Sequence, residues 1–252
     1  MERIDDTGFG GIRVIQKKGS GYGVDAVLLA AFAAGESGAA GLPKNAGKPL
    51  RIADLGTGSG IVAFILHHKL GGARISGYDV NPDAVDRAKR ACSMNGLTED
   101  MDFFCTDITD ISGGESGLRG TFDAVVSNPP YFRRTPDEPG AADPDERYVA
   151  RHETTADISD FARTAALMLR AGGSLYMVHR PDRRADIICE LRSAGLEPKE
   201  MQLVVPVVGE PANIVLIHAV KGAGPELRML PETAVHLPGG DYTEDILRYY
   251  ER

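Results

Sequence analysis

From residue 50 onward, short apolar runs alternate with segments that have helical periodicity. The apolar runs are residues 51–55, 73–79, 101–105, 122–126, 174–178, 203–208 and 213–220. The expected helices between them are residues 61–70, 82–94, 158–169 and 184–193. This alternation is typical of an α/β fold, in which helices cover both faces of a mostly parallel sheet. We therefore predict a seven-stranded sheet whose last two strands form a hairpin.

The segments before and after this alternation are expected to be smaller additions to one main domain. Three parts are predicted: residues 1–48 as a short N-terminal extension and linker, residues 49–220 as the main domain, and residues 221–252 as a C-terminal tail packed on it. The extension should contain a strand, a glycine-rich loop and a helix that starts near Asp25. Asp25 is either a cap of that helix or part of a loop and helix start that close over a ligand.

The composition limits the classes of partner. A net charge of −8 at pH 7 argues against a general nucleic-acid binder, which usually has excess positive charge, so any RNA contact should come from local patches. No apolar run approaches the length needed to span a membrane, and residues 1–6 lack a signal-peptide core. The three cysteines are odd in number and far apart, which predicts neither disulfides nor a zinc site. These features favour a cytoplasmic protein without a metal.

The apolar run at residues 122–126 stops at the motif Asn128-Pro129-Pro130-Tyr131. The two prolines cannot continue a strand ladder, and they hold the preceding residues extended. The strand end therefore presents the Asn128 amide, the Pro129 carbonyl and the Tyr131 ring. Two acceptors beside an aromatic face suit a planar group with an NH2, such as a nucleobase edge or a carboxamide. Accepting both N–H bonds favours a tetrahedral nitrogen whose lone pair can attack an electrophile, although the prolines alone could also be a loop stop.

A glycine-rich turn, Asp54-Leu55-Gly56-Thr57-Gly58-Ser59-Gly60, lies between the first strand of the main domain and its first helix. Glycines let the backbone approach a ligand, and a helix N-terminus offers free amides to an anionic group. Asp79, at the end of the second strand, would hydrogen-bond a ribose diol. The same spacing fits dinucleotide binding. The turn and Asp79 alone therefore do not distinguish a dinucleotide from another cofactor with an adenosyl group.

The presence of both this turn and Asn128–Tyr131 distinguishes the two classes of cofactor, because open parallel sheets bind ligands at the carboxyl ends of their strands. With both motifs, the chain resembles the class I S-adenosylmethionine-dependent N-methyltransferases, a Rossmann-like family with an Asn-Pro-Pro-Tyr (NPPY) motif. Within them it is most similar to the bacterial tRNA adenine-N6 methyltransferases that modify the adenine after the anticodon of a valine tRNA. The closer similarity covers nearly the whole chain and includes residues 13–17, 25–29, 150–153, 172–173 and 240–243.

The resemblance implies S-adenosylmethionine as cofactor, an adenine N6 amine of tRNA as methyl acceptor, and no metal. The cofactor-binding residues that it implies are Asp54, Gly56, Thr57, Gly58, Gly60, Asp79, Val80, Asp107, Ile108 and Asn128. The glycines would hold the methionine part with Asp54 near its ammonium, Asp79 would bind the ribose, and Asp107 or Ile108 would contact the adenine. The acceptor amine would be held by Asn128 and the Pro129 carbonyl, while Tyr131 stacks on the base.

Basic residues near the motif are candidates for phosphate contacts, or else belong to a solvated loop of mixed charge. They are Lys17, Lys18, Arg133, Arg134, Arg147 and Arg151. Acidic residues outnumber arginines in the long connection 132–154. Of the sequence features, this excess of negative charge agrees least with an RNA partner.

Two other interpretations remain open. One is a protein methyltransferase that acts on the N5 amide of a glutamine, although such enzymes usually carry a larger N-terminal helical domain than the roughly 50 residues present here. The other is a methyltransferase for a different acceptor, or a non-catalytic module that binds the cofactor.

Overall fold

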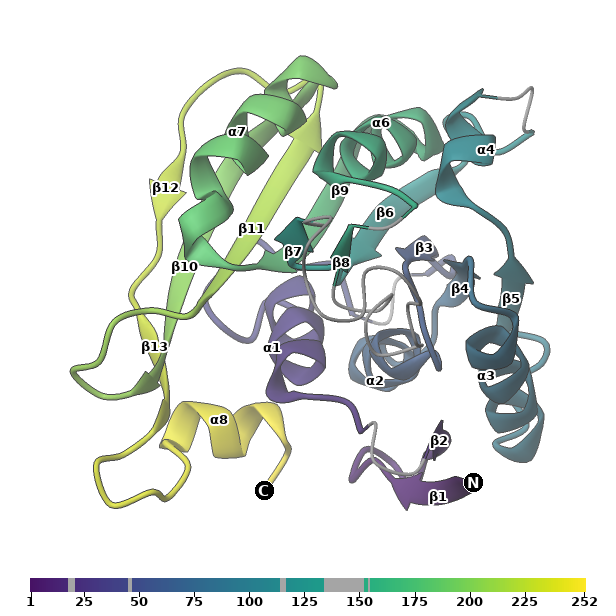
Figure 1. Cartoon of the computed structure of the whole chain (residues 1–252), viewed down its shortest axis with the longest axis horizontal. Helices are drawn as coiled ribbons and strands as arrows, with labels where there is room; N and C mark the ends of the chain where they lie inside the picture. The colour runs from purple at the N-terminus through teal and green to yellow at the C-terminus, as the bar shows by residue number, and fades with distance from the viewer. Residues whose placement is uncertain (18–20, 45–46, 114–116, 134–151, 154) are drawn as a thin grey trace.

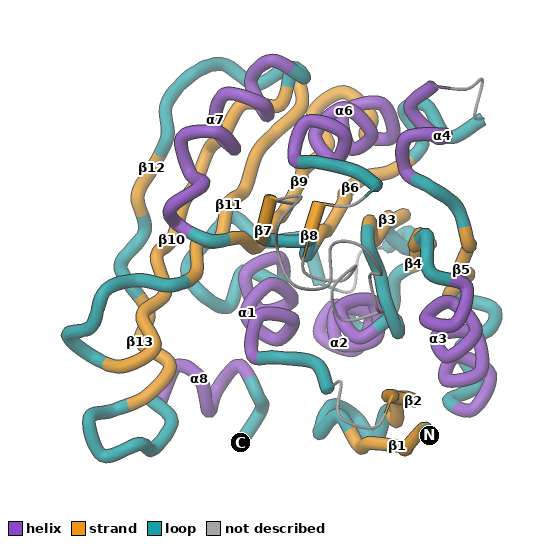
Figure 2. Tube along the Cα trace, in the orientation of Figure 1, coloured by secondary structure: helices purple, strands orange, loops and turns teal. Residues whose placement is uncertain are grey.

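The computed structural model describes residues 1–17, 21–44, 47–113, 117–133, 152–153 and 155–252 (Figures 1 and 2). The strands are β1 (Glu2–Asp6), β2 (Arg13–Lys17), β3 (Arg51–Leu55), β4 (Arg74–Asp79), β5 (Met101–Cys105), β6 (Phe122–Ser127), β7 (Phe132–Arg133), β8 (His152–Glu153), β9 (Leu169–His179), β10 (Leu196–Val207), β11 (Ile214–Lys221), β12 (Arg228–Met229) and β13 (Thr233–His236). The α-helices are α1 (Val24–Ala33), α2 (Ile61–Leu70), α3 (Pro82–Met94), α4 (Ile108–Gly113), α6 (Ile158–Met168), α7 (Arg184–Ser193) and α8 (Glu244–Tyr249).

One large sheet forms the centre of the molecule, in the order β12-β10-β11-β9-β6-β3-β4-β5, with β13 also paired to β10. From β5 to β9 the neighbouring strands are parallel. β11 is antiparallel to both β9 and β10, so β10 and β11 form the expected hairpin. The carboxyl ends of β3, β4, β5 and β6 therefore meet at one edge of the sheet.

Helices cover both faces of this sheet (Figure 1), as the alternating sequence pattern predicts. Successive strand residues point to opposite faces, and β3 shows the result. Ile52 packs in the core formed with α1, α2 and α3. Ala53 packs in the core formed with α4, α6 and α7. The central strands are thus buried on both sides, which explains their continuous apolar runs.

Local signals start and stop the helices that border the site. Asn81 caps α3 by accepting hydrogen bonds from the backbone N–H groups of Asp83 and Ala84, and Pro82 takes the first helical position. Asp157 and Asp160 form a reciprocal capping box at the start of α6. Gly71 ends α2 in the left-handed region, with φ of 70°.

The sheet has nine strands, whereas we predicted seven. The seven predicted strands are present, and the additions, β12 and β13, come from the C-terminal tail and pair with β10. Their pairing is long-range, and their own short sequences carry no strand pattern. β9 starts at Leu169, earlier than predicted, but Gly172 has a left-handed φ of 72° and the pairing with β6 shifts register between Leu169 and Ser174. In the described parts of the chain, no helix is long and apolar enough to cross a membrane.

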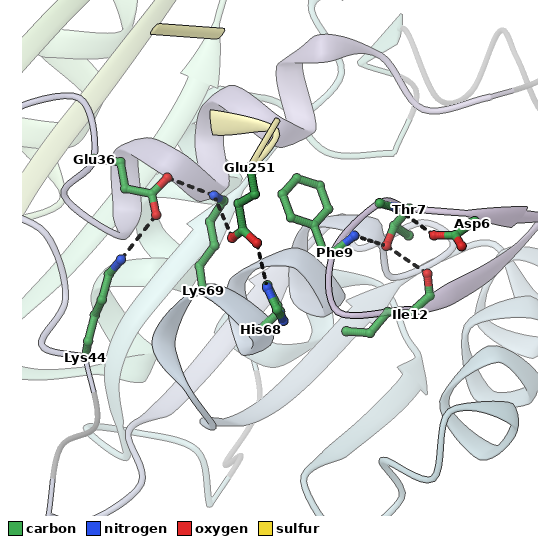
Figure 3. A network of polar contacts seen from close by, with 10 residues as sticks. Asp6, Thr7, Phe9, Ile12, Glu36, Lys44, His68, Lys69 and Glu251 are labelled. Carbon is green, nitrogen blue, oxygen red and sulfur yellow. Dashed lines mark hydrogen bonds and ion pairs between the residues drawn. The ribbon is translucent and has the colours of Figure 1, made fainter. Parts of the chain in front are cut away.

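The N-terminal segment and the C-terminal tail meet at α2 (Figure 3). The Lys69 ammonium, on a fully buried side chain, donates a hydrogen bond to Glu36 at 2.8 Å and lies 3.6 Å from a Glu251 carboxylate oxygen. It also lies 5.1 Å from the centre of the Phe9 ring. This one cation therefore links both ends of the chain to the main core. The division into residues 1–48, 49–220 and 221–252 stays a prediction.

Candidate active site

A cavity of about 600 Å³ lies at the carboxyl ends of β3, β4, β5 and β6. The predicted site residues that line it are Gly56, Thr57, Gly58, Asp79, Val80, Asp107, Ile108, Asn128, Pro129 and Tyr131. Asp54 and Gly60 are not part of the lining. The cavity thus brings together the glycine turn and the NPPY motif, which are about 70 residues apart in the sequence.

The glycine turn is held to the end of β4 by its backbone. The N–H groups of Gly56 and Thr57 both donate to the Tyr78 carbonyl, at 2.9 and 3.0 Å. Gly60 is the N-cap of α2 and has φ of 84°. A Cβ at Gly60 would lie 2.8 Å from the Phe64 ring and 3.0 Å from the Phe103 ring. Gly60 is therefore needed for the packing behind the turn, outside the cavity lining.

Asp54 lies beneath the turn, where only 1% of its surface is exposed. Its Oδ2 accepts a hydrogen bond of 2.7 Å from the Thr57 hydroxyl. Burial raises the pKa of Asp54 to about 7. These contacts close the turn from below, so the structure gives Asp54 a role in shaping the turn that the sequence motif did not specify.

The raised pKa of Asp54 predicts a pH-dependent stability difference. A carboxyl with a folded pKa of about 7 and an unfolded pKa of about 3.9 stabilises the fold below the unfolded value, and this stabilisation is lost as the pH rises through 7. Asp54→Asn cannot titrate. Relative to this variant, the wild-type free energy of unfolding should fall by roughly 2–3 kcal/mol between pH 5 and pH 8. Urea unfolding at several pH values measures the difference, and a pH-independent difference would contradict the burial argument.

Asp79 links the turn to the following helix. Its Oδ2 accepts from the Gly58 N–H at 2.7 Å, and its Oδ1 accepts from the Asn81 N–H at 2.8 Å. Asp79 also lines the cavity. A carboxylate has about four acceptor positions, so Asp79 can order the turn and still receive hydroxyl groups of a ligand.

The residues that follow β5 form another part of the cavity lining. Asp107 Oδ1 accepts hydrogen bonds from the Thr109 N–H and hydroxyl, at 2.9 and 2.7 Å, and this arrangement starts α4. Ile108 is buried behind it, whereas Val80 is 38% exposed. Val80, Asp107 and Ile108 thus border the same cavity, and they offer it one carboxylate and two apolar side chains.

In the NPPY motif that follows β6, the Tyr131 hydroxyl lies between two oxygen atoms. It is 2.7 Å from Asn128 Oδ1 and 2.7 Å from Asp25 Oδ2. The Tyr131 ring also contacts the His179 ring, with 5.2 Å between centroids. Burial, followed by the nearby Asp25 carboxylate, raises the pKa of Tyr131, so its hydroxyl stays protonated. Tyr131 is therefore held by Asn128 within the motif and by residues from two other parts of the chain, Asp25 and His179.

Asp25 and strand β2 complete the cavity. From the sequence, Asp25 was expected either to cap a helix or to belong to a loop and helix start that close over a ligand. Gly23 is the N-cap of α1, so Asp25 is the second helical residue and its side chain bonds Tyr131. Gln16 and Lys17 at the end of β2 also line the cavity. Asn95 holds β2 in place, because its side chain exchanges hydrogen bonds with the backbone of Arg13 at 2.9 and 2.7 Å. The sequence signals for this wall were the glycine-rich loop before Asp25, the basic Lys17, and the family resemblance of residues 13–17 and 25–29.

The predicted phosphate-contact residues are only partly described. Lys17 is exposed at the cavity. Arg133 belongs to β7, and Lys18, Arg134, Arg147 and Arg151 lie outside the described residues. Within the described ranges, no cluster of three or more histidine, cysteine or acidic side chains is arranged to hold a metal ion.

Comparison with solved structures identifies the fold. A predicted O-methyltransferase from Agrobacterium tumefaciens superposes with a TM-score of 0.67, at 24% identity, over 90% of this chain and 95% of that protein. A geranyl diphosphate C-methyltransferase from Streptomyces coelicolor superposes with a TM-score of 0.55, at 13% identity, over 77% of each chain. The chain has the class I methyltransferase fold.

Sequence comparisons agree with this methyltransferase fold. Residues 39–143 match the family model of the methyltransferase small domain. The tRNA1(Val) (adenine(37)-N6)-methyltransferase of Porphyromonas gingivalis is 30% identical over 66% of this chain and 60% of its own length. The enzyme of the same name from Bacteroides fragilis is 26% identical over 90% of both chains. A release factor glutamine methyltransferase from Chlorobaculum tepidum is 34% identical, over 60% of this chain and 52% of its own length.

Proposed function

We propose that this protein transfers a methyl group from S-adenosylmethionine to the exocyclic N6 amine of an adenine in RNA. The observation that carries the proposal is that Asn128 and Tyr131 line the same cavity as the glycine turn and Asp79. One space then holds a cofactor half and an acceptor half. The relatives named tRNA1(Val) (adenine(37)-N6)-methyltransferase support a tRNA anticodon loop as the substrate, and such a substrate would place the enzyme in the cytoplasm.

The cofactor half would bind S-adenosylmethionine through the glycine turn and Asp79. Gly56 and Gly58 have no side chains, so the backbone of the turn would let the methionine part of the cofactor approach closely. Asp79 would receive the ribose hydroxyls, and Val80, Asp107 and Ile108 would border the adenine. Structures with this fold contain S-adenosyl-L-homocysteine or sinefungin, which supports the choice of cofactor. When bound, the cofactor supplies an electrophilic methyl group on a sulfonium, so the chain needs no nucleophilic side chain.

The acceptor half would hold an aromatic amine. Asn128 Oδ1 and the Pro129 carbonyl would accept its two N–H bonds, which directs the nitrogen lone pair away from them and toward the methyl group. Held in this way, the nitrogen would be oriented to receive the methyl group of the sulfonium, with S-adenosyl-L-homocysteine as the leaving group and the surplus proton passing to water. Tyr131 would stack on the base, a contact worth roughly 1–3 kcal/mol per base in single-stranded nucleic acids.

Asp79→Ala is expected to weaken S-adenosylmethionine binding by about 1.5–3 kcal/mol, the usual loss for a hydrogen bond to a charged group. The substitution also removes the acceptor of the Gly58 N–H, which loosens the turn. Isothermal titration calorimetry measures the change. Asp83→Asn, on an exposed side chain of the adjacent helix, is the control and should bind normally. Equal affinity of the Asp79 variant and the wild type would remove Asp79 from the cofactor site.

A glutamine amide is the second candidate acceptor, because the same two oxygens can hold a carboxamide. The Chlorobaculum tepidum relative carries the name of that activity. Its similarity covers 60% of this chain, whereas the Bacteroides fragilis relative matches 90%. The longer match favours the tRNA enzyme.

Transfer of a labelled methyl group to two acceptors in parallel tests the choice. One acceptor is bulk tRNA, and the other is a peptide with an exposed Gly-Gly-Gln sequence. We expect label in tRNA alone. Label in the peptide and not in tRNA would assign the protein to the glutamine methyltransferases.

A further inference from the structure

The Tyr131 hydroxyl has more hydrogen-bond acceptors around it than it has protons. A phenol carries one O–H, yet the oxygen lies 2.7 Å from both Asp25 Oδ2 and Asn128 Oδ1. The raised pKa of Tyr131 means that this single proton is retained at ordinary pH. One of the two short contacts therefore has the phenolic proton in it, and the other does not.

The phenolic proton belongs in the contact with Asp25. Hydrogen bonds to an ionised carboxylate are roughly twice as strong as those between neutral groups, and Asn128 offers only a neutral amide oxygen. Asp25 is also well supported in this position. It sits in the first turn of α1, and the seven residues from Ala26 to Phe32 that follow it are all buried. The carboxylate thus faces Tyr131 from a rigid element.

We propose that Asp25 is a positioning residue for methyl transfer, which takes the Tyr131 proton and so keeps Asn128 Oδ1 available to the acceptor amine. This inference rests on the proposed function. With the proton directed to Asp25, Asn128 Oδ1 faces the phenolic oxygen at 2.7 Å without a proton between them, and two acceptors at that distance repel each other. An N–H group that enters beside them gives Asn128 the missing donor. Before an amine binds, the site therefore favours a group that donates a hydrogen bond over a group that accepts one.

Without the Asp25 carboxylate, the phenolic proton would turn to Asn128. The acceptor amine would then compete with Tyr131 for the same amide oxygen. Asp25 would therefore act on methyl transfer only through the Tyr131 hydroxyl. A merely structural Asp25 would instead affect the enzyme whether or not that hydroxyl is present.

The location of the proton can be tested without any activity. In protein labelled with 13C at tyrosine Cζ, the Tyr131 signal is assigned by its loss in Tyr131→Phe. We expect Asp25→Asn to shift this signal more than Asn128→Ala does, because the phenol donates to Asp25. An equal or larger shift in Asn128→Ala would overturn the inference.

Kinetics on tRNA tests the consequence. Asp25→Asn should lower kcat about tenfold, as for one lost hydrogen bond, and leave cofactor affinity unchanged. In the Tyr131→Phe background the same substitution should cost less than twofold. Asp83→Asn, also an acidic residue in the first turn of a helix, is the matched control and should change neither background. An equal loss from Asp25→Asn in both backgrounds would overturn the inference. If the wild type does not methylate tRNA, the proposed function fails, and the NMR comparison alone decides the role of Asp25.

Discussion

Asn128→Ala is expected to slow methyl transfer by a hundred-fold or more, with little change in affinity for S-adenosylmethionine. The substitution removes the amide oxygen beside Tyr131 that is proposed to accept a hydrogen bond from the acceptor amine. Loss of a preorganised polar group at a reacting centre typically costs about 3–4 kcal/mol of transition-state stabilisation. The cofactor half, with the glycine turn and Asp79, is left intact. Single-turnover rates and calorimetry on the same preparation separate the two effects.

A matched control for this variant is Asn213→Ala. Asn213 is exposed between β10 and β11, outside the cavity lining, and its replacement should leave the rate unchanged. Near wild-type turnover by Asn128→Ala would show that Asn128 only terminates β6. An equal fall in cofactor affinity and rate would place Asn128 in the cofactor half instead.

Gly60→Ala is expected to destabilise the protein by about 2–4 kcal/mol. Part of the cost is the left-handed backbone, since φ of 84° costs an ordinary residue roughly 1–2 kcal/mol. The rest is overlap of the new Cβ with the rings of Phe64 and Phe103, and overpacking of this kind typically costs about 1–3 kcal/mol. Denaturant unfolding measures the loss.

Gly58→Ala separates the two costs. Gly58 also has a positive φ, of 55°, but a Cβ there would meet nothing within 4 Å. Its replacement should therefore cost only the backbone share, roughly 1–2 kcal/mol. Equal destabilisation by the two substitutions would contradict the assignment of Gly60 to the packing between α2 and β5.

The sequence predicted the central strands because their burial on both faces leaves continuous apolar runs. It missed strands whose existence depends on a partner. β1 is Glu-Arg-Ile-Asp-Asp, a polar segment mostly exposed, and it is a strand because it pairs with β2. β12 and β13 are short and follow the edge set by β10. The glycines at 172 and 173 indicated a break, and the pairing of β9 with β6 shifts register there and resumes at Ser174, although the strand itself starts at Leu169.

The predicted site residues at strand ends came together because parallel strands end at the same edge of a sheet. Asp25 could not be placed in this way, since its contact with Tyr131 joins residues 106 positions apart. That contact depends on how α1 packs against the sheet, which no local pattern records. The sequence also could not show that Asp54 is buried beneath the turn and bonded to the Thr57 hydroxyl. The contact of Asp54 with the cofactor, which the family resemblance implies, stays a prediction.

Mass spectrometry of nucleosides from tRNA incubated with the enzyme and isotope-labelled S-adenosylmethionine identifies the methylated atom. Asn128, the Pro129 carbonyl and Tyr131 are proposed to hold an exocyclic amine. We therefore expect labelled N6-methyladenosine, absent when Asn128→Ala replaces the wild type. Label in another nucleoside, in a ring-methylated adenosine, or in no nucleoside at all would contradict it.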